Sequence, residues 1–256
     1  MTRFCSLVSG SSGNVLYLEH KKTKILIDCG ISCKRVADSL QFIGVSPEEI
    51  DAILVTHEHA DHVCGIRVFS NKFGCKVYSG EKTLENISCG EAVAVESGRV
   101  FEIGDVSVTP FAIPHDAVQP MGFAFECGGK KLSVATDMGK IDASVAEAIR
   151  GSDFVFIEAN HNLEMLKNGP YPFYLKQRIL SSEGHMSNDQ CASLVAALAR
   201  TGTKRFVLGH LSNTNNTPEL ARKTVADCLT EGGFEVGKDV LLDVAKRHSV
   251  SEIYEI

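Results

Sequence analysis

Six consecutive residues, His57-Glu-His-Ala-Asp-His62, constrain this chain more than any other segment. They follow residues 51–56, an apolar, β-branched stretch that predicts a buried strand. Histidines two residues apart do not share a helix face, so the run is not the helical His-Glu-x-x-His zinc motif. In a turn at the carboxyl end of a strand, however, its imidazoles and its carboxylate Asp61 can converge on one point. These are the ligands that zinc-like ions prefer, so the run predicts a metal site rather than a polar surface turn.

Polar side chains also stand at the ends of five further apolar stretches. They are Asp28, His115, Asp137, Glu158 and His210. A single aspartate after a strand is usually a helix cap or a turn residue. Five such residues in order, together with the histidine run, instead indicate a site assembled at strand ends, as α/β folds commonly build them.

Strands followed by helices recur in both halves of the chain, which favours two packed sheets with helices outside. We therefore expect a four-layer αββα sandwich, as one domain over residues 1–256. The expected strands include 4–8, 15–19, 24–28, 106–113, 154–158 and 205–208, and the expected helices are 32–43, 63–73, 187–200 and 218–230. The helix at 187–200 should be capped by Ser187 or Asn188.

Composition bounds the function only loosely. The net charge of −6 neither favours nor excludes a nucleic-acid partner. Nine cysteines without a Cys-x-x-Cys pair indicate no disulfide framework and suit a reducing compartment, so we expect a cytoplasmic protein. No stretch reaches the roughly 18 apolar residues that a membrane span needs, so no membrane partner is expected.

The order of these residues resembles the metallo-β-lactamase superfamily, whose central motif is His-x-His-x-Asp-His. The resemblance implies the fold of that family and two divalent ions, of zinc, manganese or iron. It implies seven ligands: His57, His59 and His115 for one ion, Asp61, His62 and His210 for the second, and Asp137 bridging both. Asp28 would orient the histidine run rather than bind metal.

A site of this kind implies two-metal hydrolysis, in which a bridging water becomes hydroxide near neutral pH and the ions stabilise charge on the substrate oxygens. The ligands alone fit thioesterases as well as phosphodiesterases. The segment Gly184-His185-Met-Ser, at a helix start, resembles a loop of the nuclease branches, in which the histidine pairs with a glutamate, here Glu158. A histidine held by a carboxylate suits a general acid that protonates a departing sugar oxygen. The alternative is a solvated histidine in a helix turn.

The turn Ser9-Gly-Ser-Ser-Gly-Asn14 is either a flexible hairpin or a phosphate-binding loop. Together with the other motifs it resembles the YycJ/WalJ family over nearly the whole chain. The resemblance implies a 5′-to-3′ DNA exonuclease, with DNA as its partner and a suggested role in repair. Ser11 and Asn14 are the possible phosphate contacts in this turn.

Two basic residues before His185 are further candidates for phosphate contact. Lys176 and Arg178 could bind the phosphate backbone, or they form an ordinary solvated helix face. The role of His161 is open, and His20 and His248 have no motif context and are expected at the surface. The oligomeric state is also open.

Several other functions remain as alternatives. A tRNase Z-type nuclease would use the same Glu158–His185 pair, but it normally carries an inserted arm that binds tRNA, and no such inserted segment is found in this sequence. A glyoxalase II-like thioesterase should have a helical, basic extension, whereas residues 237–256 are short and strand-like. A lactamase should carry an export signal, which residues 1–10 do not resemble. The non-enzymatic alternative is a metal-binding regulatory protein.

Overall fold

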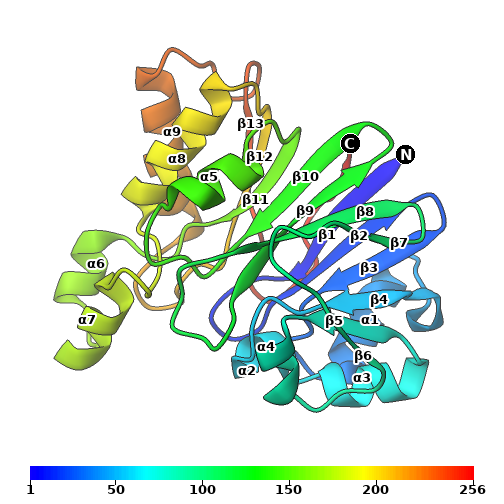
Figure 1. Ribbon diagram of the computed structural model, residues 1–256. Helices are drawn as coiled ribbons and strands as arrows, with labels where there is room; N and C mark the ends of the chain where they lie inside the picture. Colours follow the sequence, from blue (N-terminus) through cyan, green and yellow to red (C-terminus); the bar gives the residue numbers. More distant parts are fainter. The chain divides into compact units, whose positions relative to one another are not determined.

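The computed structural model describes residues 1–256 (Figure 1). The chain divides into two compact units. The first unit comprises Met1–Phe111, Ala117–Lys130 and Lys246–Ile256, and the second comprises Ala112–Asp116 and Lys131–Ala245. The expectation of one domain over residues 1–256 stays a prediction.

A seven-stranded sheet in the first unit carries the histidine run. Its order is β14-β1-β2-β3-β4-β5-β6, antiparallel from β14 to β3 and parallel from β3 to β6. The strands are β1 (Thr2–Val8), β2 (Val15–His20), β3 (Thr23–Ile27), β4 (Ala52–Leu54), β5 (Lys76–Ser79), β6 (Ala92–Ala94) and β14 (Ile253–Glu255). Because β3 and β4 are parallel, their carboxyl ends share one edge of the sheet. Asp28 and the histidine run therefore leave the sheet at the same edge.

Short helices flank this sheet and bury their apolar positions against it. They are α1 (Cys33–Phe42), α2 (Ala60–Val63), α3 (Ile66–Phe73) and α4 (Glu81–Glu85), with a 3₁₀ turn at Pro47–Glu49. The core beneath them includes Leu7, Tyr17, Ile53 and Phe69, each at most 1% exposed. Three more strands are hydrogen-bonded in the order β9-β8-β7: β7 (Phe101–Ile103), β8 (Val106–Ala112) and β9 (Met121–Cys127).

One predicted helix is wrong in its extent. The segment 63–73 is divided between α2 and α3, which meet at Gly65. A Cβ at Gly65 would lie 2.1 Å from the carbonyl oxygen of Ile31. Only glycine at position 65 therefore lets the start of α3 approach the backbone of Ile31 this closely. This close approach is a tertiary constraint that the local sequence pattern does not contain.

The second unit contains four parallel strands in the order β10-β11-β12-β13. They are β10 (Lys130–Ala135), β11 (Phe154–Glu158), β12 (Arg205–Gly209) and β13 (Leu241–Val244). The helices are α5 (Ala143–Ile149), α6 (Leu163–Asn168), α7 (Phe173–Leu180), α8 (Asn188–Arg200) and α9 (Pro218–Glu231). In Figure 1, α8 and α9 lie beside the strands, whereas α6 and α7 form a hairpin that lies clear of them.

The helix predicted at 187–200 is confirmed, and Ser187 is its cap. The Ser187 hydroxyl accepts a hydrogen bond from the Gln190 backbone N–H at 3.2 Å, and the Gln190 side chain accepts one from the Ser187 N–H at 2.9 Å. This reciprocal capping box fixes where α8 begins, directly after His185 and Met186. No helix in the structure has both the length and the hydrophobicity that crossing a membrane would need.

Candidate metal centre

In the first unit, Asp28 and Thr56 organise the histidine run. The Asp28 carboxylate accepts hydrogen bonds from the Thr56 backbone N–H at 2.8 Å, from the Thr56 hydroxyl at 2.9 Å, and from Nδ1 of His62 at 2.7 Å. Because the Thr56 hydroxyl donates its only proton to Asp28, its oxygen accepts a hydrogen bond from Nδ1 of His57, which lies 3.0 Å away. Both imidazoles therefore carry their proton on Nδ1 and their lone pair on Nε2, the form in which a histidine binds metal.

The side chains of the run face one another. The ring of His57 lies 4.6 Å from that of His59 and 4.1 Å from that of His62, measured between centroids. Nε2 of His62 lies 3.5 Å from a carboxylate oxygen of Asp61. Two donor atoms at this separation can share one cation, and the donor set of imidazoles and a carboxylate suits zinc, manganese or iron.

The turn at residues 9–14 is packed onto the run rather than flexible. Asn14 is 5% exposed, and its side-chain amide lies 3.4 Å from Asp61 Oδ2 and 3.2 Å from Nε2 of His62. The backbone N–H of Asn14 also donates to the carbonyl of Asp61 at 2.8 Å. A Cβ on Gly30 would lie 1.7 Å from that carbonyl oxygen, so Gly30 permits the contact. Asn14 thus holds Asp61 in place; the phosphate contacts of Asn14 and the exposed Ser11 stay predictions.

In the second unit, parallel strand ends deliver Asp137, Glu158 and His210, as the sequence predicts. Asp137 Oδ1 lies 3.3 Å from Nδ1 of His210 and 3.9 Å from Nε2 of His115. Nδ1 of His115 lies 3.1 Å from the Gly184 carbonyl and donates to it, which leaves the lone pair of His115 on Nε2. Burial lowers the pKa of His115 below its ordinary value, and a neutral ring is the form that binds metal.

Glu158 is the centre of this second cluster. It is fully buried, and its Oε1 lies 2.8 Å from Nδ1 of His185 and 2.9 Å from Nδ1 of His210. Its Oε2 accepts the backbone N–H groups of Met138 at 2.8 Å and Met186 at 3.1 Å. Burial raises the pKa of this carboxyl, but the charges and hydrogen bonds of the two histidines outweigh burial and hold the pKa well below its usual range. Asp137, Glu158, His185 and His210 offer ligand atoms that all lie within 4.8 Å of one another.

Three of the predicted site residues adopt a left-handed backbone conformation. The φ angles are 61° at Asp28, 60° at Asp137 and 54° at His210. Residues other than glycine rarely adopt such angles, which cost about 1–3 kcal/mol and cluster at functional sites. Each follows a parallel strand closely, so the turn that ends the strand also directs the side chain into its cluster.

Other predictions have mixed outcomes. Arg178 forms an ion pair with Asp116, and the ammonium of Lys176 donates to the carbonyl of Lys167 at 2.7 Å, so Lys176 is not simply solvated. His248 is exposed as expected. The surface expectation for His20 is wrong: it is 4% exposed, and its Nδ1 lies 2.8 Å from the Thr2 hydroxyl.

His161, whose role the sequence left open, is buried in the second unit. It is 1% exposed, and neither ring nitrogen has a hydrogen-bond partner. Burial lowers the pKa of His161 to about 4, so the ring is neutral. Sequence reasoning also missed Thr56 and the Gly184 carbonyl; a threonine beside a histidine run was the one available signal.

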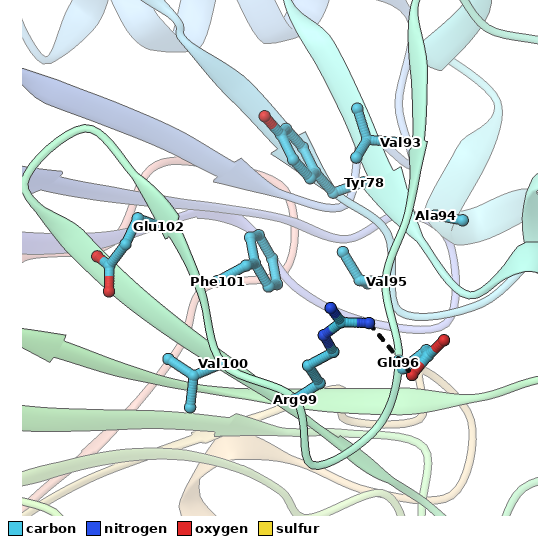
Figure 2. A pocket seen from close by; sticks show the side chains of 9 residues that line it. All are labelled: Tyr78, Val93, Ala94, Val95, Glu96, Arg99, Val100, Phe101 and Glu102. Carbon is cyan, nitrogen blue, oxygen red and sulfur yellow. Dashed lines mark ion pairs between the residues drawn. The ribbon is translucent and has the colours of Figure 1, made fainter.

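A separate pocket of about 430 Å³ lies in the first unit (Figure 2). Its walls include Tyr78 and Phe101, whose rings stack with centroids 5.4 Å apart, and the ion pair of Arg99 with Glu96 at 3.8 Å. None of the residues that the sequence predicts for the site lines this pocket. The strand-end clusters, and not this pocket, are therefore the candidate site.

Comparisons with known proteins agree with this geometry. The profile described as the beta-lactamase superfamily domain matches residues 23–211. Exodeoxyribonuclease WalJ of Streptococcus pneumoniae is 39% identical over 246 residues, covering 93% of this chain and 91% of that protein. Exodeoxyribonuclease YycJ of Bacillus anthracis is 38% identical over 242 residues, covering 92% of each.

The fold is shared with solved structures of low sequence identity. The metallo-beta-lactamase fold protein YhfI from Bacillus subtilis superposes with a TM-score of 0.77 at 15% identity, covering 98% of this chain and 100% of that one. This likeness and the profile match confirm the predicted αββα fold class. The chain belongs to the beta-lactamase superfamily and, within it, to the family of the WalJ and YycJ exodeoxyribonucleases.

Proposed function

We propose that this protein is a divalent-metal-dependent phosphodiesterase that degrades DNA from an end, in the 5′-to-3′ direction. The observation that carries the proposal is the buried Glu158 carboxylate, which contacts both His185 and His210 through one oxygen. The relatives that match nearly the full length, named exodeoxyribonucleases, supply the substrate class.

The proposed metal ligands are the seven residues of the family pattern: His57, His59, Asp61, His62, His115, Asp137 and His210. The fit is supported by the ring nitrogens, because His57, His62, His115 and His210 each engage Nδ1 with an oxygen of the protein. That pattern presents Nε2 as the ligand atom at four positions. When bound, two divalent ions would activate a water molecule as nucleophile and stabilise the charge that develops on the phosphate oxygens.

His185 is proposed as the general acid. Its Nδ1 is held by Glu158, and the ring is about one-fifth exposed, so Nε2 can reach a substrate while the ring orientation stays fixed. A departing sugar alkoxide is a poor leaving group, because hydroxyl groups of this kind have pKa values near that of water, about 15.7. Proton delivery from an oriented histidine then contributes roughly 10²- to 10⁴-fold to the rate.

The same argument separates this function from thioester hydrolysis. A departing thiol has a pKa of about 8.5 and leaves as thiolate without an acid. The contact of the buried Glu158 with His185, which orients that histidine as an acid, therefore favours an oxygen leaving group. The tRNA-processing alternative shares this dyad and is distinguished by its substrate, which makes it an outcome of the test below.

The setting of the activity is part of the proposal. Nine free cysteines suit a reducing compartment, and we place the protein in the cytoplasm, acting on DNA ends during repair.

The test is digestion of DNA by purified protein loaded with Mn²⁺ or Zn²⁺. Oligonucleotides labelled at the 5′ or the 3′ end, single- or double-stranded, should be shortened from the 5′ end, and Asp61→Ala should show no shortening. Inductively coupled plasma mass spectrometry on the same samples counts the bound ions. The proposal is refuted if metal-loaded protein leaves every DNA substrate intact. Cleavage of precursor tRNA instead would support the RNA-processing alternative, and metal binding without any hydrolysis would support a regulatory protein.

A further inference from the structure

Helix α7 turns apolar side chains outward. At about 100° per residue, Leu175, Lys176 and Ile179 fall on one side and the remaining residues on the other. The outward side carries Phe173 and Tyr174, both 73% exposed, and Leu180, 47% exposed. Single exposed apolar residues are ordinary, but three on two turns of one helix mark an interaction site. We call Phe173, Tyr174 and Leu180 the outer face of α7.

This face is coupled directly to His185. The backbone N–H of His185 donates to the carbonyl of Ile179 in the last turn of α7 at 3.0 Å. A Cβ on Gly184 would lie 2.2 Å from the same carbonyl oxygen, so the loop lies tightly against the helix end. Eight residues of helix span about 12 Å. At a stacked spacing of about 3.4 Å per nucleotide, that is room for three or four bases beside the reacting phosphate.

The charge of α7 suits a polyanion. The helix carries Lys176 and Arg178 and no acidic residue. Arg178 pairs with Asp116, but its side chain is still 53% exposed and lies one turn after Tyr174 on the outward side, so it is the cation nearest the outer face, whereas Lys176 lies on the other side. The pocket of the first unit is a poorer candidate, because its two glutamates, Glu96 and Glu102, outnumber its one arginine.

We propose that the outer face of α7 is a stacking surface for the bases of single-stranded DNA. The proposal rests on the exonuclease function proposed above and adds that the DNA bound next to the site is single-stranded. Aromatic side chains bind successive bases by stacking, which tolerates any sequence, while nearby cations follow the phosphates. An enzyme that shortens DNA progressively needs such sequence-independent grip.

The test measures binding by the metal-loaded full-length protein. The probe is a fluorescent phosphorothioate oligothymidylate, which resists cleavage, compared with an abasic strand that has the same phosphates and no bases. Stacking contributes about 1–3 kcal/mol per base, so the double variant Phe173→Ala/Tyr174→Ala should raise the Kd for oligothymidylate about 5- to 150-fold per base lost. Binding of the abasic strand should be weak and equal in both proteins.

Controls separate this surface from general effects. Phe42 on α1 is 79% exposed, so Phe42→Ala removes an equally exposed aromatic and should leave binding unchanged. The exchange Phe173→Tyr/Tyr174→Phe keeps both rings and should retain affinity. Thermal melting checks that each variant is folded.

Three outcomes would overturn the proposal: unchanged oligothymidylate affinity in the double variant, an equal loss for the abasic strand, or a change in sedimentation that assigns the face to a protein dimer. Failure of the nuclease function is distinct from these, because it leaves the wild-type protein binding the strand without shortening natural DNA.

Discussion

Replacing Glu158 by glutamine tests whether one buried carboxylate supports both metal binding and catalysis. Glu158 accepts four hydrogen bonds, two from imidazoles on Oε1 and two from backbone N–H groups on Oε2. Backbone N–H groups cannot become acceptors, so the glutamine must keep its oxygen on their side. Its NH₂ group then faces Nδ1 of both His185 and His210.

That orientation forces the histidines into the wrong form. To accept from the NH₂ group, each ring must carry its lone pair on Nδ1 and its proton on Nε2, and a protonated Nε2 cannot bind metal. Loss of such a supporting partner typically weakens metal affinity 10- to 100-fold. Glu158→Gln should therefore raise the Kd of the ion that His210 binds by that factor. Turnover should fall by about 100-fold or more, since His185 loses its orienting carboxylate.

The assay is a competition titration with a chelating dye, run beside end-labelled DNA digestion at saturating metal. The matched control is Glu164→Gln on α6, because the Glu164 side chain is 73% exposed. If Glu158→Gln binds metal and degrades DNA as the wild type does, the proposed role of the carboxylate is wrong. If Glu164→Gln loses as much affinity, the effect does not belong to the site.

Four further variants probe separate parts of the molecule. His185→Ala should lower DNA turnover about 100-fold or more at unchanged metal content; equal loss of metal would make His185 a ligand. Asp61→Ala should abolish activity and remove about one ion per chain by mass spectrometry. His161 is neutral when folded, with a pKa lowered from 6.5 to about 4, so the unfolded chain binds more protons between these values and stability falls as pH drops from 6.5 to 4. His161→Gln should lose that dependence, up to about 3 kcal/mol in urea unfolding of metal-free protein, while His248→Gln should keep it. Gly30→Ala should displace Asp61 and reduce metal binding, because the added Cβ would lie 1.7 Å from the carbonyl oxygen of Asp61. Wild-type metal affinity in this variant would contradict that expected clash.

The strands and the polar residues that end them were predictable because both leave local patterns in the sequence. Buried parallel strands are short apolar runs, and the residues that end them are polar, so Asp137, Glu158 and His210 could be identified from position alone. Helix α6 was missed, and α7 was foreseen only as a possible helix face at Lys176 and Arg178, because both helices are short and Pro172 interrupts their pattern. His20 was misplaced because its burial depends on Thr2, 18 residues away.

The supporting atoms of the site were harder to foresee. The Gly184 carbonyl and the Met138 and Met186 N–H groups belong to the backbone, and a backbone group leaves no residue type to recognise. Their roles follow only from how loops pack in three dimensions. The sequence could therefore identify Glu158 as the partner of His185, but not that the same oxygen also holds His210.

Backbone strain and hydrogen bonding together explain why these strand-end residues stay in place. A left-handed aspartate or histidine costs about 1–3 kcal/mol, so Asp28, Asp137 and His210 would relax unless something opposed it. For Asp28 the opposing contacts are the hydrogen bonds from Thr56 and His62, and for His210 the contact with Glu158. Hydrogen bonds to a charged group contribute about 1.5–3 kcal/mol each, which is enough to offset the strain at either position. Around Asp137, its Oδ1 lies 3.9 Å from Nε2 of His115, 3.6 Å from Nδ1 of His185 and 3.3 Å from Nδ1 of His210. Asp137 is the proposed bridging ligand, so a cation bound to its carboxylate would add a charge contact to those with these rings and stabilise the left-handed turn further.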